Sequence, residues 1–351
     1  MQRQPVLFGS ALILATLTMC VPLGAQKRGK EQKREDRREN AADLPAVMSR
    51  DSDDIQTLNL FYGAGGAEHA PDPGGRYTFL EEDLNGTNPK FDVQDANGVE
   101  WRVKLDSVKQ FHPERHNETQ AETAASRLLW AAGYFVDEDY YLRDLTVSGL
   151  PELRRGEKFV SAGGKVHDVR LKRRPKDVKK LGDWDWFANP FLGTRELNGL
   201  RVMMALLNNW DLGADNNSVY EVGDERRFLV GDIGASFGKS GDDFTRSKGV
   251  LEDYAGSTFI ERKTPEYVDF VMHDRPFFMV IFDFAKYRER TRMEHITRHI
   301  PIADARWLGA KLAQLSEEQL RDCFRAAGYA PDEVDGFVRA VQNRIAALNA
   351  L

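Results

Sequence analysis

Two acidic residues and one amide stand out in the stretch from residue 206 to residue 238, which reads LLNNWDLGADNNSVYEVGDERRFLVGDIGASFG. Asp211 and Asn216 form a D-x-x-x-x-N pattern, and Asp232 follows an apolar run within the sequence GDIG. Carboxylate and amide oxygens are the ligands that Mg²⁺ prefers, and a carboxylate can accept the proton of an attacking hydroxyl group. Aspartate and asparagine are also common in turns, so the interpretation depends on what the rest of the chain places beside them.

Upstream of this stretch, the alternation of apolar and polar residues predicts three short strands. They are expected at residues 77–80, 90–94 and 99–105, and the last two are joined by an Asn-Gly turn. In the third strand, Trp101 and Val103 share one face, and Lys104 lies on the other. A solvated charge on an exposed strand is the ordinary alternative for a lysine at this position.

A helix is expected next, at residues 121–132, because this segment is rich in alanine, leucine and glutamate. Gly133 ends it, as a glycine commonly does at a helix C-terminus. The helix carries Glu122 in its first turn, where a solvated charge is again the ordinary alternative.

The second half of the chain is mostly helical in pattern. Apolar residues recur at helical spacing over residues 195–210, and this helix delivers Asp211 at its end. Further helices are expected from residue 265 to residue 348. Between the two halves, the run KRRPKDVKK at residues 172–180 is basic; it either meets an acidic substrate or a phosphate, or it forms a solvated loop.

The order of these elements resembles the protein-kinase-like superfamily, and is most similar to its atypical branch. That branch includes HipA-like kinases, phosphoinositide kinases and the secreted casein kinases of the Golgi. The resemblance covers roughly residues 77–238 and is carried by WRVKL, ETAASRLLWAAGY, NWDLGADNN and GDIG, in that order. It implies a bilobal α+β fold with a β-rich N-lobe, one key helix and a helical C-lobe, and it implies ATP and Mg²⁺ as cofactors.

The resemblance also implies roles for individual residues. Asp211 would be the catalytic aspartate, and Asn216 and Asp232 would hold the metal, with Asn217 and Asp215 as rivals of Asn216. Lys104 would bind the phosphates of ATP, and Glu122 would pair with it. The remaining expected phosphate contacts come from the loop at residues 84–89, which contains Gly86 and Asn88.

The sequence departs from the kinase pattern at several points. The loop at residues 84–89 has no G-x-G-x-x-G, there is no A-P-E segment, and Asn209-Trp210 replaces the His-Arg pair before the catalytic aspartate. Arg102 stands where protein kinases place a small residue under the adenine, and Lys90 is therefore an alternative to Lys104. Two functions remain open: an exported kinase that phosphorylates a protein or a small molecule, with nucleotidyl transfer as a variant, and a non-catalytic pseudokinase or binding module.

The N-terminus has the pattern of a secretory leader, with Arg3 before an apolar run at residues 6–21. We expect a signal peptide at residues 1–25, a disordered charged linker at 26–54, the N-lobe at 55–175 and the C-lobe at 176–351. The expected location is secreted or periplasmic, with retention at the membrane by the N-terminus as the alternative. The net charge of −6 does not indicate nucleic-acid binding, and no membrane insertion is expected beyond the leader.

Overall fold

The computed structural model describes residues 35–36, 39, 41–51, 54–86, 88–106, 117–240, 246–271 and 284–351. The chain divides into two compact units, Met1–Ala42 and Asp43–Leu351, and all that follows concerns the second. The expected signal peptide at residues 1–25 lies outside the described residues. Within the described part of the chain, no helix is both long and apolar enough to cross a bilayer.

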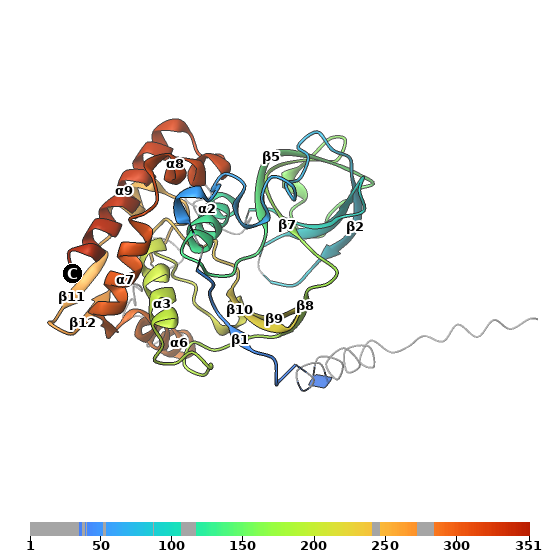
Figure 1. Ribbon diagram of the computed structural model, residues 1–351. Helices are drawn as coiled ribbons and strands as arrows, with labels where there is room; N and C mark the ends of the chain where they lie inside the picture. The colour runs from blue at the N-terminus through green and yellow to red at the C-terminus, as the bar shows by residue number, and fades with distance from the viewer. Residues whose placement is uncertain are drawn as a thin grey trace, which may run out of the picture. The chain divides into compact units, whose positions relative to one another are not determined.

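The N-terminal half of this unit is built on a six-stranded sheet (Figure 1). Its strands are β2 (Tyr77–Asp83), β3 (Lys90–Asp95), β4 (Glu100–Lys104), β5 (Asp139–Ser148), β6 (Val160–Ser161) and β7 (Lys165–Arg173). They lie in the order β4-β3-β2-β5-β7-β6, and an additional pairing of β4 with β7 closes five of them into a barrel. Closure removes the free sheet edges that an open arrangement would expose.

The barrel interior is apolar because alternate residues of each strand point inward. Phe91, Val93, Trp101 and Val103 are buried inward-facing residues of β3 and β4, and Leu171 joins them from β7. The intervening residues of the same strands face outward, and Lys104 is one of them, opposite Lys90 in the register of β3 and β4. The pattern that builds the core therefore also fixes the side on which Lys104 lies.

Helix α2 (Glu118–Ala131) packs against β5 and β7 on the outside of this barrel and against α8 (Glu317–Ala326) of the C-terminal half. The backbone N–H of Thr119, in its first turn, donates to Asp106 Oδ1 at 3.1 Å, which satisfies one of the free donors of a helix N-terminus. Gly133 follows the helix with a φ of 88°, a conformation that glycine adopts without steric cost. Nearly the whole surface of α2 is buried, so the helix is held between the two halves of the unit.

The C-terminal half contains α3 (Arg195–Leu207) and a four-stranded sheet of order β1-β10-β9-β8. The strands of this sheet are β1 (Ala46–Val47), β8 (Lys179–Gly182), β9 (Asn217–Val222) and β10 (Glu225–Val230). Thr194 caps α3, and Asn208 ends it in a left-handed conformation. The remaining helices include α4 (Leu251–Gly256), α6 (Phe284–Glu294), α7 (Ile302–Leu312), α8 (Glu317–Ala326) and α9 (Pro331–Asn349). A small third sheet is formed by β11 (Ile260–Lys263), β12 (Tyr267–Phe270) and β13 (Ile300–Pro301). The predicted α+β fold, with a β-rich N-lobe that contains one helix and a helical C-lobe, is confirmed.

Three expectations need correction. The helices expected from residue 265 onward do not begin there, because residues 267–270 form β12, which pairs with β11 and β13. The linker predicted over residues 26–54 includes β1, which pairs in parallel with β10 through Ala46 and Arg226. This strand is only two residues long, and its contact is a backbone pairing with a segment far along the chain, so no local pattern in the sequence indicates it. The basic run at 172–180 is also not a single loop, since it starts in β7 and ends in β8.

Candidate active site

Two loops at the C-terminal ends of α3 and β10 are joined by backbone hydrogen bonds. Asp211 follows α3, and its carbonyl oxygen accepts a bond of 3.1 Å from the side-chain amide of Asn216. The carbonyl of Asn216 in turn accepts from the N–H of Gly231 at 2.8 Å, and the N–H of Trp210 donates to Ala235 at 3.3 Å. The loop with Asp211 and Asn216 is therefore fixed beside the loop with Asp232.

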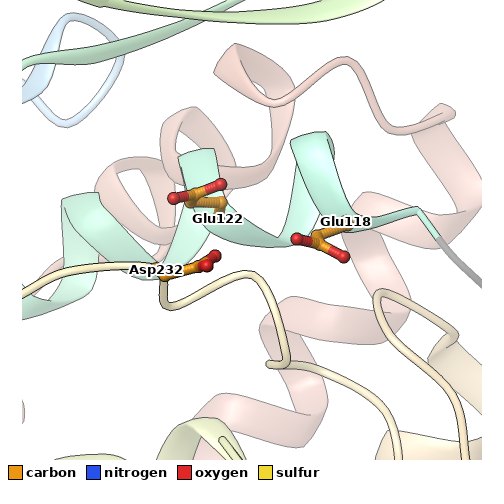
Figure 2. A group of neighbouring side chains, drawn as sticks. All are labelled: Glu118, Glu122 and Asp232. Carbon is orange, nitrogen blue, oxygen red and sulfur yellow. The ribbon is translucent and has the colours of Figure 1, made fainter. Parts of the chain in front are cut away.

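Lys104 is the centre of the site. Its Nζ lies 2.6 Å from Glu118 Oε1, 2.9 Å from Glu122 Oε2 and 2.7 Å from Asp232 Oδ1. Figure 2 shows the three carboxylates converging, two from successive turns of α2 and one from the loop after β10. The structure thus brings together Lys104, Glu122 and Asp232, three of the residues predicted from the sequence, and adds Glu118. The roles assigned to them remain predictions.

Charge dominates the protonation of this group. Burial alone would lower the pKa of Lys104, but Asp232, Glu118 and Glu122 outweigh it and hold the pKa well above its ordinary value. Lys104 likewise lowers the pKa of Asp232. Burial would raise the pKa of Glu118, but Lys104 and Lys248 together lower it. Lys104, Asp232 and Glu118 are therefore charged at neutral pH.

A second layer of ion pairs orients these carboxylates. Glu122 uses its other oxygen, Oε1, to accept from Arg170 at 3.0 Å, and Arg170 also binds Asp139 at 2.9 Å. Glu118 uses Oε2 to bind Lys248. The sequence analysis missed Glu118, Arg170 and Lys248. Glu118 could have been found, because residues four apart share one face of a helix, but the other two come from distant segments.

Asp232 is held in a special backbone conformation. Its φ is 45°, in the left-handed region that few non-glycine residues adopt, and such positions cluster at functional sites. Its side chain is 54% exposed although it reaches the buried Lys104. The glycine of the D-x-G pattern has a packing role, because a Cβ on Gly234 would lie 2.4 Å from Cγ of Glu118.

Asp211 has the properties of a proton acceptor. Burial and the negative charge of Asp232 raise its pKa, which makes its carboxylate a stronger base.

Of the residues near Asn216, Asp215 is exposed, and Asn217 is buried with its amide donating to the carbonyl of Trp184 at 3.0 Å. Asn216 itself is half-buried beside the residue that precedes Asp232.

The predicted phosphate loop is fastened by an arginine that the sequence analysis did not single out. Arg155 donates to the carbonyl of Gly86 at 2.6 Å and to those of Asp83, Asn85 and Asn88 at 3.1, 3.3 and 3.4 Å. Asn88 is buried, and its amide donates to the carbonyl of Leu105 at 3.4 Å. One N–H of its side-chain amide is therefore engaged within the fold, and its contact with phosphate stays a prediction.

The chemistry of the site suits a hard divalent cation. Glu118, Glu122 and Asp232 each offer a carboxylate oxygen, and these oxygens lie within 4.8 Å of one another. Mg²⁺ and similar ions prefer such oxygen ligands. The ammonium group of Lys104 already lies among them, so the carboxylate that can turn toward an ion most easily is the exposed one, Asp232.

No model of a known protein family matches this sequence, and no curated protein matches it. Among solved structures, the chain is similar to a Helicobacter pylori proinflammatory kinase, CtkA, with 11% identity, a TM-score of 0.46, and coverage of 78% of this chain and 96% of that one. It is also similar to the Golgi casein kinase, with 10% identity, a TM-score of 0.36 and coverage of 97% and 93%. A structure of the Golgi casein kinase with Mn/ADP bound gives 11% identity, a TM-score of 0.36 and coverage of 98% and 94%.

Proposed function

We propose that this protein is an atypical kinase that transfers the γ-phosphoryl group of Mg-ATP to a hydroxyl group. The observation that carries the proposal is the buried Lys104, which binds Glu122 on α2 and Asp232 on the loop after β10. A lysine held by a helix glutamate, beside an aspartate that can bind a metal, is the arrangement that phosphoryl transfer requires for positioning and for charge stabilisation.

Each residue has a distinct task in the proposed reaction. Lys104 binds the phosphates, and Glu122 keeps it in place. Asp211 orients the acceptor hydroxyl and takes its proton as the oxygen bonds to the γ-phosphorus, while the bond from that phosphorus to the β,γ-bridging oxygen breaks and ADP leaves. A divalent cation, held by Asp232 and Asn216, would neutralise the negative charge of the phosphate oxygens.

The ion pairs of Lys104 imply a rearrangement when a nucleotide binds. Asp232 and the phosphates of ATP each need a positively charged partner, and in this structure Lys104 forms an ion pair with Asp232. When the triphosphate arrives, Lys104 would turn to the phosphates and Asp232 to the metal, and each negative group would keep a positive partner. Glu118 and Glu122 would hold Lys104 through this exchange.

The acceptor and the location complete the proposal. We propose a protein or a small molecule as acceptor and export from the cytoplasm, as the N-terminal sequence predicts. The competing function is a non-catalytic binding module. Lys104 favours it in one respect, because its ammonium group is paired with three carboxylates.

Calorimetry with Mg-ATP and a phosphoryl-transfer assay separate the two functions. Asp232→Ala is expected to lower nucleotide affinity and abolish transfer, whereas Asp224→Ala, at an exposed turn position outside the site, should change neither. Tight binding without transfer to any acceptor or to water supports the binding module. Absence of Mg-ATP binding in the unmodified chain would contradict the kinase.

A further inference from the structure

The outward face of the barrel beside Lys104 is charged. Along β3, β4 and β7, cross-strand pairing places Lys90 opposite Lys104, Asp92 opposite Arg102, and Arg102 opposite Lys172. Residues that pair directly across strands share a face, so these side chains lie on the side of the sheet that carries Lys104. The outward residues of these three strands next to Lys104 are thus polar or charged.

An ion-pair network fixes this face. Arg102 binds both oxygens of Asp92, at 2.8 and 3.0 Å, and also Asp83 at 2.7 Å. Arg174 binds Asp92 as well, and Lys172 binds Asp137. Asp92 is 2% exposed, so its partners are held in place and do not move freely in solvent. Opening an apolar surface here would strand a buried carboxylate without a partner.

The apolar residues of the same strands are unavailable to a ligand. Phe91, Val93, Trp101 and Val103 alternate with the charged residues and are 0–2% exposed inside the barrel. A flat heteroaromatic base is normally held between apolar or aromatic surfaces, with a few polar groups at its edge. On this face of the sheet, such a base would meet charged side chains that already form ion pairs with one another.

A nucleotide bound at Lys104 cannot avoid this region if it lies along the sheet. Residues two apart on a strand are separated by roughly 7 Å, which is less than the span from the phosphates to the base of a nucleotide. Arg102 is two residues from Lys104 on β4, and Lys90 is directly opposite Lys104 on β3. Lys90, at 3.9 Å from Asp83, offers positive charge to phosphate and sugar oxygens, whereas Arg102 is engaged by Asp92 and Asp83.

We propose that the phosphoryl donor is recognised through its triphosphate and not through its base, so that ATP, GTP, CTP and UTP are all accepted. This inference rests on the proposed function and narrows its substrate to the class of triphosphates. The recognising groups are Lys104, Lys90 and the backbone loop fastened by Arg155, and the pair Arg102–Asp92 denies the base an apolar surface.

The test is calorimetry of the full chain with Mg²⁺ and each of ATP, GTP, CTP, UTP and inorganic tripolyphosphate. The expected result is that the dissociation constants of the four nucleotides agree within about fivefold and that tripolyphosphate competes with ATP. ATP binding more than about fivefold tighter than UTP would overturn this inference and leave the kinase proposal intact. Absence of binding by every triphosphate would instead overturn the kinase proposal itself.

A double substitution tests the physical cause. Arg102→Leu with Asp92→Leu replaces the ion pair by apolar side chains. Asp83 keeps Lys90 as a cation and Arg174 can turn to solvent, so we expect some loss of stability but a folded protein. The variant is expected to gain a preference of about tenfold for ATP over UTP, because a purine stacks on an apolar surface better than a pyrimidine does. Thermal unfolding confirms that the variant is folded. A folded double variant with no gain in preference would contradict the assigned role of the Arg102–Asp92 pair.

Discussion

Nζ of Lys104 lies 2.7 Å from Oδ1 of Asp232, although the two residues are 128 positions apart in the chain. One sits on a barrel strand and the other on the loop after β10, so the ion pair joins the β-rich and helical halves of the same compact unit. Removing either charge is therefore expected to affect stability as well as the proposed nucleotide binding, and experiments on this site need to separate the two effects.

Lys104→Ala is expected to destabilise the fold. Glu118 and Glu122 are 3% and 2% exposed, and the change would leave both with one fewer cation in a buried position. Breaking a buried ion pair by removing one partner costs about 3–5 kcal/mol, and urea unfolding at pH 7 measures it. Lys90→Ala is the matched control, because Lys90 lies 3.9 Å from Asp83 and is more exposed, so its loss should cost less than about 1 kcal/mol. Equal stability of the two variants would contradict the prediction that the ion pairs of Lys104 stabilise the fold.

Gly234→Ala tests the close approach of the D-x-G loop to α2. The added Cβ would lie 2.4 Å from Cγ of Glu118 and 3.2 Å from its backbone oxygen, so Glu118 must shift. The expected outcome is a loss of about 1–3 kcal/mol in the free energy of unfolding together with weaker Mg-ATP binding. Gly256→Ala, which has open space around its added Cβ, should leave both quantities within about 1 kcal/mol of the original protein. Unchanged binding in Gly234→Ala would mean that the position of Glu118 does not matter for the ligand.

The parts of the site that follow local rules could be predicted from the sequence. Strand alternation placed Lys104 on the face opposite Trp101, and helix propensity placed Glu122 on α2, although the helix begins three residues earlier than predicted, at Glu118, so that Glu122 lies in its second turn. The D-x-G pattern located Asp232 on a loop after a strand. These three residues are brought together, although their assigned roles remain to be tested.

The remaining features depend on contacts between distant segments. Arg170 reaches Glu122 only because β7 pairs with β4 and closes the barrel. The sequence of neither strand predicts this pairing. In the sequence, Arg155 similarly resembles an ordinary surface charge, and only the fold brings it to the carbonyl of Gly86. The same holds for β1, whose two residues gain their conformation from pairing with β10.

The carboxyl group of Asp106 predicts a pH dependence of stability. Burial, reinforced by the charge of Glu118, raises its pKa to about 7, well above the value in the unfolded chain. The folded protein therefore binds the proton more tightly, and the associated stability is complete below about pH 4 and is lost as the pH rises through 7. Asp106→Asn should be more stable than the original protein at pH 7.5 by roughly 1–2 kcal/mol, a value reduced for the partial exposure of this side chain, with no difference at pH 4.

Urea unfolding at several pH values measures this effect. Asp224→Asn, at an exposed turn position, is the matched control and should follow the original protein at every pH. A difference between Asp106→Asn and the original protein that stays constant from pH 4 to pH 7.5 would show that Asp106 does not titrate in this range.

Arg155→Ala is expected to loosen the loop that contains Gly86 and Asn88. Arg155 donates to four backbone carbonyls of this loop, and each such bond contributes about 0.5–1.5 kcal/mol. Amide hydrogen exchange in residues 84–90 should therefore become faster. If the loop covers the phosphates as proposed, the dissociation constant for Mg-ATP should rise about tenfold, because part of the binding energy is then used to order the loop.

The neighbouring Arg154 provides the control for this prediction. Its side chain is exposed, and only its backbone N–H contacts Glu82, at 3.1 Å, so Arg154→Ala removes a positive charge of the same kind without releasing the loop. Faster exchange in Arg155→Ala with unchanged nucleotide affinity would place the loop outside the binding site. Weaker binding in both variants would instead indicate a general effect of surface charge, because the two substitutions share only that loss.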